Sequence, residues 1–211
     1  MFTDLGYLIE VIQCNYERIC SLWDAENHNI NLKKRQVINI REENEILNSI
    51  WKYRALINDE MINILFSLND IPYTNSAVTG RVKAQNSIEF KIENYILHHE
   101  GGRIPIKKCI NDLLGIRIVI DAQFSYFDVK RYMENNFPKY KCIDSAKDAY
   151  IATHIYFEKG NYYFPWELQV WMKNHEMDNY NSHKIYKQDY TKWESGSEGG
   201  VEDGKTFYNF E

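Results

Sequence analysis

The chain has 211 residues, of which 44% are hydrophobic, 26% charged and 15% aromatic. This length and composition suit one folded domain with an extension and exclude a disordered chain. Lysine and arginine number 25 against 30 aspartates and glutamates, so the formal net charge is −5, which excludes a uniformly basic nucleic-acid-binding protein but not a local basic patch.

The N-terminal third is predicted to form two helices. Apolar residues recur with helical spacing over residues 5–23 and again over 46–68. A polar stretch at 24–31 separates the two helices. The second ends at Asp70-Ile71-Pro72, because a residue before proline disfavours the helical conformation. We assign residues 1–72 to an N-terminal helical extension.

The pattern changes after residue 72 and predicts a sheet with helices packed on it. Residues 78–82, 115–120, 150–157 and 162–170 have the composition of strands. The turn at 159–161 predicts that the last two strands pair as a hairpin. Helices are expected at 126–136, at 173–190 and from Asn86 onward, where Glu89 completes a capping-box-like pair. Residues 139–149 are expected to form a loop.

These elements define the fold class as α/β (α+β), with a mixed sheet of about five strands flanked by helices. Residues 73–193 form the predicted domain. Residues 194–211 are rich in glycine and acidic residues, which is typical of a flexible acidic tail.

Cysteine usage and hydropathy indicate an intracellular protein. The four cysteines, Cys14, Cys20, Cys109 and Cys142, form no Cys-x-x-Cys pair and have no histidine at zinc spacing. We therefore expect free thiols rather than a disulfide framework. No signal peptide or apolar run of membrane-spanning length is evident, so the predicted location is the cytoplasm, without a membrane partner.

Basic residues gather where the first strand leads into the next helix. Arg81 and Lys83 are expected on the same face of a strand. Ser87 follows at the helix N-terminus, where free N–H groups and the helix dipole favour an anion, and Lys91 lies one turn later. The cluster predicts a polyphosphate-binding site; a solvated basic edge is the alternative.

Acidic and amide residues flank the other predicted strands. Asp112 and Arg117 lie at the mouth of the buried strand, and Glu167 and Gln169 share one face of the last. Two carboxylates on neighbouring strands supply oxygen ligands for magnesium and a base near an attacking hydroxyl. The alternatives are ordinary loop residues and the solvated side of an antiparallel sheet.

In order and spacing, these motifs resemble the synthetase domain of the RelA/SpoT family of alarmone synthetases, and in particular its small single-domain members. The resemblance spans roughly residues 78–187. The motifs are Gly-Arg-Val-Lys at 80–83 followed by Ser87 and Lys91, Asp-x-x-Gly-Ile-Arg at 112–117, Tyr-x-x-x-His at 150–154, Glu-x-Gln at 167–169 and His-Lys at 183–184.

The resemblance implies a nucleotidyltransferase-like fold and an ATP-dependent pyrophosphokinase, an enzyme that moves the β,γ-pyrophosphate of ATP to a nucleotide 3′-hydroxyl and releases AMP. It also implies a role for each donor-side residue. Arg81 and Arg117 would sandwich the adenine, and Lys83, Ser87 and Lys91 would hold the phosphates. Asp112 and Glu167 would bind Mg²⁺, and Glu167 would also accept the proton of the acceptor hydroxyl.

On the acceptor side the resemblance implies that Tyr150 stacks on the acceptor base beside His154, with Gln169 and Glu176 completing the site. Here the chain departs from the family at four positions. They are Ala149 for glycine, Trp171 for arginine, Glu176 for the asparagine of guanine recognition and Ser182 for glutamate. The donor-side residues match the family and the acceptor-side residues do not, which suggests a different acceptor. Polar groups left unmatched in a site discriminate strongly between acceptor bases.

Three functions stay open at this point. We favour transfer to the 3′-terminal adenosine (CCA end) of tRNA, as in the toxic branch of the family, where a small antitoxin is the partner. The alternative acceptor is GDP or GTP, which would make the chain a (p)ppGpp synthetase of the stringent response. The third reading is a non-catalytic nucleotide-sensing module.

A tRNA acceptor would need a basic surface for its backbone. Lys33, Lys34 and Arg35, between the two N-terminal helices, are the candidates. A solvated helix start is the alternative for these three residues. The oligomeric state is left open by the sequence.

Overall fold

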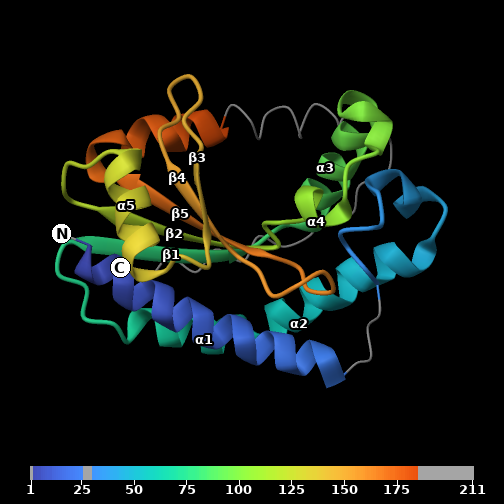
Figure 1. Cartoon of the computed structure of the whole chain (residues 1–211), viewed down its shortest axis with the longest axis horizontal. Helices are drawn as coiled ribbons and strands as arrows, with labels where there is room; N and C mark the ends of the chain where they lie inside the picture. The colour runs from blue at the N-terminus through green and yellow to red at the C-terminus, as the bar shows by residue number, and fades with distance from the viewer. Residues whose placement is uncertain (1, 26–29, 185–211) are drawn as a thin grey trace.

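The computed structural model describes residues 2–25 and 30–184 of the chain. Its centre is a five-stranded sheet with the order β1-β2-β5-β4-β3 (Figure 1). β2 and β5 pair in parallel, and the other neighbours are antiparallel, which confirms the predicted mixed sheet. The strands are β1 (Ser76–Val82), β2 (Leu114–Ile120), β3 (Lys141–Asp144), β4 (Thr153–Phe157) and β5 (Trp166–Met172).

The predicted hairpin is confirmed as the antiparallel pair β4–β5, although both strands start later than expected. β3 is a correction, because it lies within the segment that the sequence indicated to be a loop. Four residues, Lys141–Asp144, with both ends exposed are too short to show a periodic pattern. β3 forms because β4 offers it an unpaired edge.

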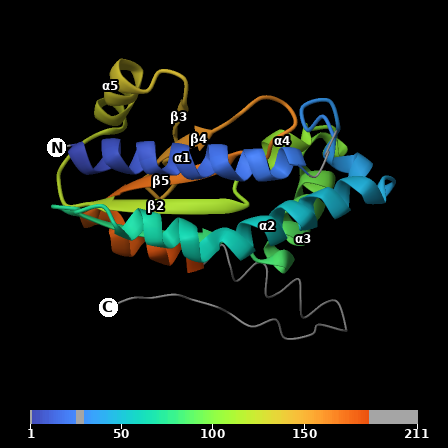
Figure 2. The ribbon, with the colours of Figure 1, turned by 90° about the horizontal axis from the view of Figure 1, so that it is seen from below.

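One face of the sheet is apolar and is covered by the two long N-terminal helices, α1 (Thr3–Ala25) and α2 (Asn44–Asn69) (Figure 2). Both were predicted from their spacing. Their apolar faces and that of the sheet form one continuous core. At its centre the buried Trp166 donates its indole N–H to the hydroxyl of Tyr53, at 3.1 Å. The residues assigned to the N-terminal extension therefore supply one whole layer of this fold.

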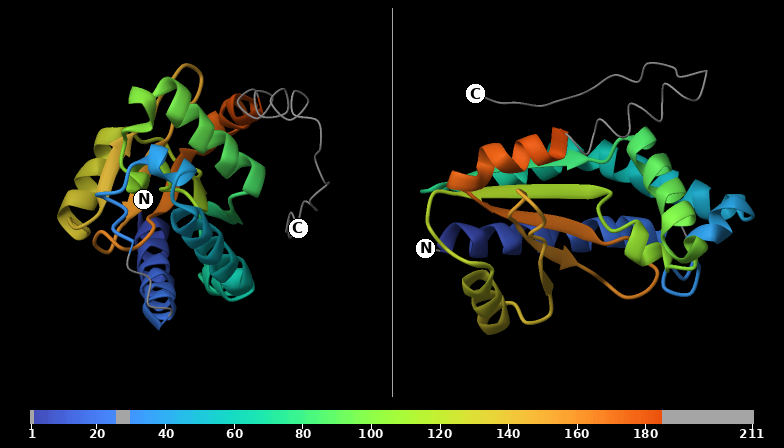
Figure 3. Two further views of the ribbon diagram at one scale, coloured as in Figure 1. Left: turned by 90° about the vertical axis from the view of Figure 1, so that its right-hand side faces the viewer. Right: turned by 90° about the horizontal axis from the view of Figure 1, so that it is seen from above.

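The opposite face carries α3 (Gln85–His98) and the helix over 176–184, as the left view of Figure 3 shows. α5 (Tyr126–Asn136) packs at the β3 edge and has its predicted bounds. Shorter elements are α4 (Ile106–Cys109) and the 3₁₀ turns η1 (Val37–Arg41), η2 (Glu100–Gly102) and η3 (Lys173–His175). The sheet thus lies between two helical layers, with α1 and α2 on its apolar face and with α3 and the helix over 176–184 on its polar face.

Two helix starts differ from the sequence-based expectation. α3 begins at Gln85 with Ala84 as its N-cap, which forms no side-chain cap, so the predicted capping pair of Asn86 and Glu89 is wrong. Glu89 instead accepts a hydrogen bond from the Gln85 amide, at 2.9 Å. The helix expected over 173–190 begins after η3, and its part from 185 onward lies outside the described residues, as does the predicted tail.

The four cysteines form no disulfide, as predicted. Over residues 2–25 and 30–184, no helix combines the length and the hydropathy that a membrane span needs.

Candidate active site

Strand pairing brings the predicted site residues together on the polar face of the sheet. One row across the strands consists of Arg81, Gly115, Glu167 and Tyr156. The next row consists of Thr79, Arg117, Gln169 and His154. Because side chains alternate between faces, all of these point away from α1 and α2. Residues predicted from four separate motifs therefore meet on one surface.

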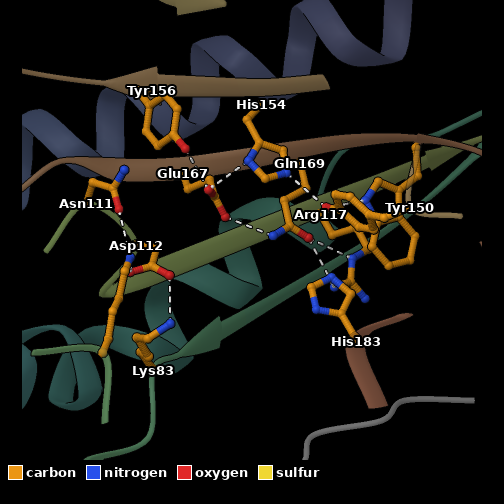
Figure 4. A network of polar contacts seen from close by, with 12 residues as sticks. Lys83, Asn111, Asp112, Arg117, Tyr150, His154, Tyr156, Glu167, Gln169 and His183 are labelled. Atoms are coloured by element: carbon orange, nitrogen blue, oxygen red, sulfur yellow. Dashed lines mark hydrogen bonds and ion pairs between the residues drawn. The ribbon is translucent and has the colours of Figure 1, made fainter. Parts of the chain in front are cut away.

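At one end of this surface lies a cluster of two lysines and an aspartate (Figure 4). The Lys83 ammonium pairs with Asp112 Oδ2 at 2.7 Å, and the Lys91 ammonium pairs with Asp112 Oδ1 at 3.0 Å. Lys91 also donates to Asn111 Oδ1 at 3.1 Å. The backbone N–H of Lys83 donates to the Leu113 carbonyl, which ties the end of β1 to the start of β2. The cluster has a net charge of +1 and suits a phosphate group.

The cluster perturbs the pKa of each of its members. Burial alone would raise the pKa of Asp112, but Lys91 and Lys83 hold it well below its ordinary value. Burial lowers the pKa of Lys83, whereas Asp112 outweighs burial at Lys91 and raises the pKa there. We therefore take Asp112 as ionised and as the main compensation for both ammonium groups.

Glu167 is the second carboxylate of the surface; it is buried and accepts three hydrogen bonds. Its Oε1 accepts from the Tyr156 hydroxyl at 2.9 Å and contacts His154 Nδ1 at 3.0 Å, and its Oε2 accepts from Gln169 Nε2 at 2.8 Å. Burial alone would raise the pKa of Glu167, but the hydrogen bond and charge of His154 hold it below the ordinary value. Glu167 is an ionised carboxylate held in one orientation.

Glu167 is one member of a closed ring of contacts that also includes Gln169, Arg117, Trp171, Tyr150 and His154. The Arg117 guanidinium donates twice to Gln169 Oε1, at 3.2 and 3.1 Å, which turns the amide N–H of Gln169 toward Glu167. Trp171 Nε1 donates to the Tyr150 hydroxyl at 3.3 Å, and that hydroxyl lies 2.9 Å from His154 Nε2.

The ring closes where Arg117 Cζ lies 3.6 Å from the centroid of the fully buried Trp171 ring. Arg117 Cζ also lies 5.2 Å from the centroid of the Tyr180 ring, so two aromatic rings of the chain itself already contact the guanidinium that the resemblance places against adenine. His154 links Glu167 and Tyr150, since its Nδ1 lies 3.0 Å from Glu167 Oε1 and its Nε2 lies 2.9 Å from the Tyr150 hydroxyl. Burial raises the pKa of Tyr150 to about 12, so its hydroxyl stays protonated.

The remaining predicted donor-side residues lie on the same surface. Ser87 is the third residue of α3, at the N-terminus of that helix as expected. Arg81 is exposed on β1, where no described residue forms an ion pair with it. Its charge nevertheless contributes to lowering the pKa of His183 to about 4, after burial and Arg117.

Two predicted groups lie outside the ring of contacts. Glu176 begins the helix over 176–184 and pairs with Lys173 at 2.7 Å. Lys33, Lys34 and Arg35 precede η1, and Arg35 pairs with Glu43 at 2.9 Å. The carbonyl of Arg35 accepts from the Ile106 N–H of α4, so this basic segment is attached near α4 and is not part of the network in Figure 4.

Sequence reasoning missed three residues of the site. Tyr156 could have been found, because it lies two residues after His154 on the same strand face. Trp171 was noted only as a departure from the family pattern. Asn179 had no sequence signal: it is fully buried, and its side-chain amide pairs with both the N–H and the carbonyl of Ile151, at 2.7 and 2.9 Å. It thereby holds the segment next to Tyr150.

The chemistry of the two carboxylates fits a magnesium ion that arrives with a nucleotide. Asp112 and Glu167 offer hard oxygen ligands on one surface, and Asp112 is near enough to act electrostatically on Glu167. Among the described residues, no group of three or more metal-ligating side chains gathers. Mg²⁺ is commonly held by one or two carboxylates together with phosphate oxygens and water, and this donor set matches that requirement.

Fold and site together define a mixed α/β protein with a built, charged surface on one face of its sheet. The structure is similar to that of small alarmone synthetase 1 from Bacillus subtilis bound to its product pppGpp, with 20% identity and a TM-score of 0.40 over 74% of this chain and 85% of that one. It is also similar to small alarmone synthetase 2 from Bacillus subtilis, with 18% identity and a TM-score of 0.41 over 68% and 81%.

A third similar structure is small alarmone synthetase 1 from Bacillus subtilis bound to AMPCPP, with 18% identity and a TM-score of 0.33 over 71% and 76%. No protein-family model and no curated protein sequence matches the chain.

Proposed function

We propose that the protein is an ATP-dependent pyrophosphokinase that transfers the β,γ-pyrophosphate of ATP to the 3′-hydroxyl of a nucleotide acceptor. The observation that carries the proposal is the placement of two lysines, the partly buried Asp112 and the buried Glu167, from three separate motifs, at the polar face of the sheet. Cations near a helix N-terminus bind phosphates, and an oriented carboxylate beside them accepts a proton.

In the proposed reaction the acceptor O3′ forms a bond to the β-phosphorus of ATP. The bond from that phosphorus to the oxygen bridging the α- and β-phosphates breaks, and its electron pair leaves with AMP. Lys83, Lys91 and Ser87 bind the phosphates, and Glu167 accepts the proton of the acceptor hydroxyl. The work of the protein is positioning and charge compensation, as in other phosphoryl transfers.

Asp112 and Glu167 are the residues that would hold Mg²⁺. When bound, the ion would neutralise charge on the phosphate oxygens and polarise the transferred group.

For the acceptor we favour the 3′-terminal adenosine of tRNA, which would stop translation and imply a small antitoxin as partner. The support is the chemistry at the positions that depart from the family. Glu176, which stands where the resemblance places guanine recognition, is paired with Lys173, and Trp171 is buried against Arg117. A site with these groups lacks the amide expected for the guanine edge. GDP or GTP is the second candidate, favoured by the intact pair of Tyr150 and His154.

The test is incubation of the purified protein with ATP labelled in its β- and γ-phosphates and with deacylated tRNA, GDP or GTP. We expect label in the tRNA band on a denaturing gel, and its loss after removal of the terminal adenosine. Label in guanosine tetra- or pentaphosphate alone would replace the tRNA acceptor by the nucleotide. Transfer to neither acceptor, with ATP still bound, would support the nucleotide-sensing module and contradict catalysis.

Substitution of Tyr150 should impair use of the acceptor and spare binding of ATP. Tyr150→Ala removes a stacking surface worth about 1–3 kcal/mol per base, so kcat/KM for the acceptor should fall about 10- to 100-fold. Tyr150→Phe keeps the ring but leaves His154 Nε2 and Trp171 Nε1 without their shared partner, and a loss of about 10-fold is expected.

The measurements are initial rates at varied acceptor concentration and calorimetric binding of an ATP analogue. The matched control is Tyr162→Ala, since Tyr162 is exposed and lies in the turn between β4 and β5. Equal acceptor kinetics for Tyr150→Ala and wild type would show that the stacking role is misassigned.

A further inference from the structure

Gly115 occupies a position where the fold of the described residues does not require glycine. It lies near the start of β2, a strand whose other residues are mostly buried and apolar. Glycine weakens a strand interior and often marks the close approach of a ligand or of another backbone. Its φ is not in the left-handed region, so the backbone conformation is open to any residue.

The space beside Gly115 is open on the polar face. A Cβ built on it would meet no heavy atom of the described residues within 4 Å. Gly80, a glycine of the neighbouring strand β1, is different: a Cβ there would lie 3.2 Å from Met61 and 3.4 Å from Leu65 of α2. Close packing against α2 therefore explains why position 80 is glycine, whereas no neighbouring side chain explains why position 115 is glycine.

The neighbours of Gly115 define what could fill the open space. In register, Arg81 of β1 lies on one side of it and Glu167 of β5 on the other. Asp112, which is paired with the two lysines, lies three residues before Gly115, just before β2 begins. A ligand over Gly115 would thus contact the lysine cluster at one end and the oriented carboxylate at the other.

We propose that the transferred phosphate groups lie over Gly115, directly against the backbone of β2, and that the size of the residue at position 115 therefore limits what the site can bind. This inference rests on the proposed function and adds to it a specific position for the donor's phosphates. A side chain at 115 would occupy that space and push the phosphates away from Glu167. Displacements of about 1 Å in such sites cost about 100-fold in rate.

The experiment is a size series, Gly115→Ala and Gly115→Val, with Ala77→Val as control. Ala77 is on β1, on the same polar face of the sheet as Gly115, but it pairs with Val119 and lies away from both carboxylates. Binding of a methylene-bridged ATP analogue is measured by calorimetry, transfer by initial rates and stability by thermal unfolding.

We expect the unfolding temperature of Gly115→Val to equal or exceed that of wild type, because valine suits a strand better than glycine. Analogue affinity and transfer should fall about 10-fold for alanine and about 100-fold or more for valine, and Ala77→Val should leave both unchanged. If Gly115→Val bound the analogue as tightly as wild type, the inference would be overturned. It would also be overturned if the unfolding temperature of Gly115→Ala fell in parallel with its loss of analogue affinity and transfer. If the wild type binds the analogue but transfers nothing, the proposed function fails while binding still tests Gly115.

Discussion

Replacement of Glu167 by glutamine should reduce pyrophosphate transfer by about 100- to 10,000-fold, the range typical of removing a proton acceptor. The change is isosteric but removes the negative charge and the proton-accepting oxygen. An amide at 167 has only one oxygen, so it cannot accept from Gln169 at one end and from Tyr156 and His154 at the other, as the two carboxylate oxygens do. Its N–H₂ must replace the acceptor in one of these two places.

The measurements for Glu167→Gln are initial transfer rates and analogue affinity. Affinity for the ATP analogue without metal should stay within about threefold of wild type, because the lysine cluster is untouched. Glu158→Gln is the matched control, since Glu158 is a partly exposed carboxylate paired with Lys107 just beyond β4. A Glu167→Gln enzyme that kept a tenth or more of wild-type transfer would show that another group accepts the proton.

The pH dependence of transfer follows from the lowered pKa of Glu167. Its ordinary value is 4.5, and His154 holds it lower in the folded protein. Protonation of Glu167 should therefore not reduce the rate until the pH falls below 4.5. An acidic limb of the rate profile with a midpoint near 6 that is absent in Glu167→Gln would contradict this assignment.

Replacement of Asp112 by asparagine should separate binding of phosphates from binding of the metal. In the ligand-free protein Asp112 neutralises one of the two ammonium charges, so a phosphate group must compete with it for Lys83 and Lys91. Without the carboxylate the cluster charge rises from +1 to +2. Affinity for tripolyphosphate in the presence of EDTA should then increase about 5- to 10-fold, since one unit charge at about 4 Å is worth about 1 kcal/mol in water.

Transfer with Mg²⁺ should fall at least about 100-fold in Asp112→Asn, because an oxygen ligand of the ion and a charge partner of the lysines are both lost. Calorimetry with tripolyphosphate and initial rates measure the two effects. Asp70→Asn, at the end of α2, is the control for loss of an acidic residue elsewhere. Weaker binding of metal-free tripolyphosphate in Asp112→Asn would contradict the competition.

Asp112 also contributes to stability in a pH-dependent way. Its folded pKa is lowered below the ordinary 3.8, so its contribution is fully present above that value and is lost as the pH falls through the folded pKa. Breaking a buried ion pair by removing one partner costs about 3–5 kcal/mol. The free energy of unfolding of Asp112→Asn should therefore be lower than that of wild type at pH 7, and the difference should shrink toward pH 2.

Strand periodicity predicted part of the site. Because side chains alternate along a strand, Glu167 and Gln169 were expected on one face, and the structure shows them so; that Arg81 lies in the same row as Glu167 came only from the register of β1, β2 and β5. The hairpin of β4 and β5 followed from its turn, and α5 has its predicted bounds. In contrast β3 was missed, because four residues carry too few alternations to distinguish a strand from a loop.

The amino-acid sequence by itself determined which residues of the 211 could carry phosphate chemistry, since their types and spacing are local properties of the chain. Only the tertiary structure decided their partners. Asp112 is shared by two lysines, Trp171 covers one face of Arg117, and Asn179 holds the backbone of Ile151 from 28 residues away. These contacts join segments that are distant along the chain, and packing of helices on the sheet brings them within hydrogen-bond distance. The net charge of −5 describes the chain as a whole, whereas folding brings Arg81, Lys83, Lys91 and Arg117 together with two carboxylates, Asp112 and Glu167, at one face of the sheet.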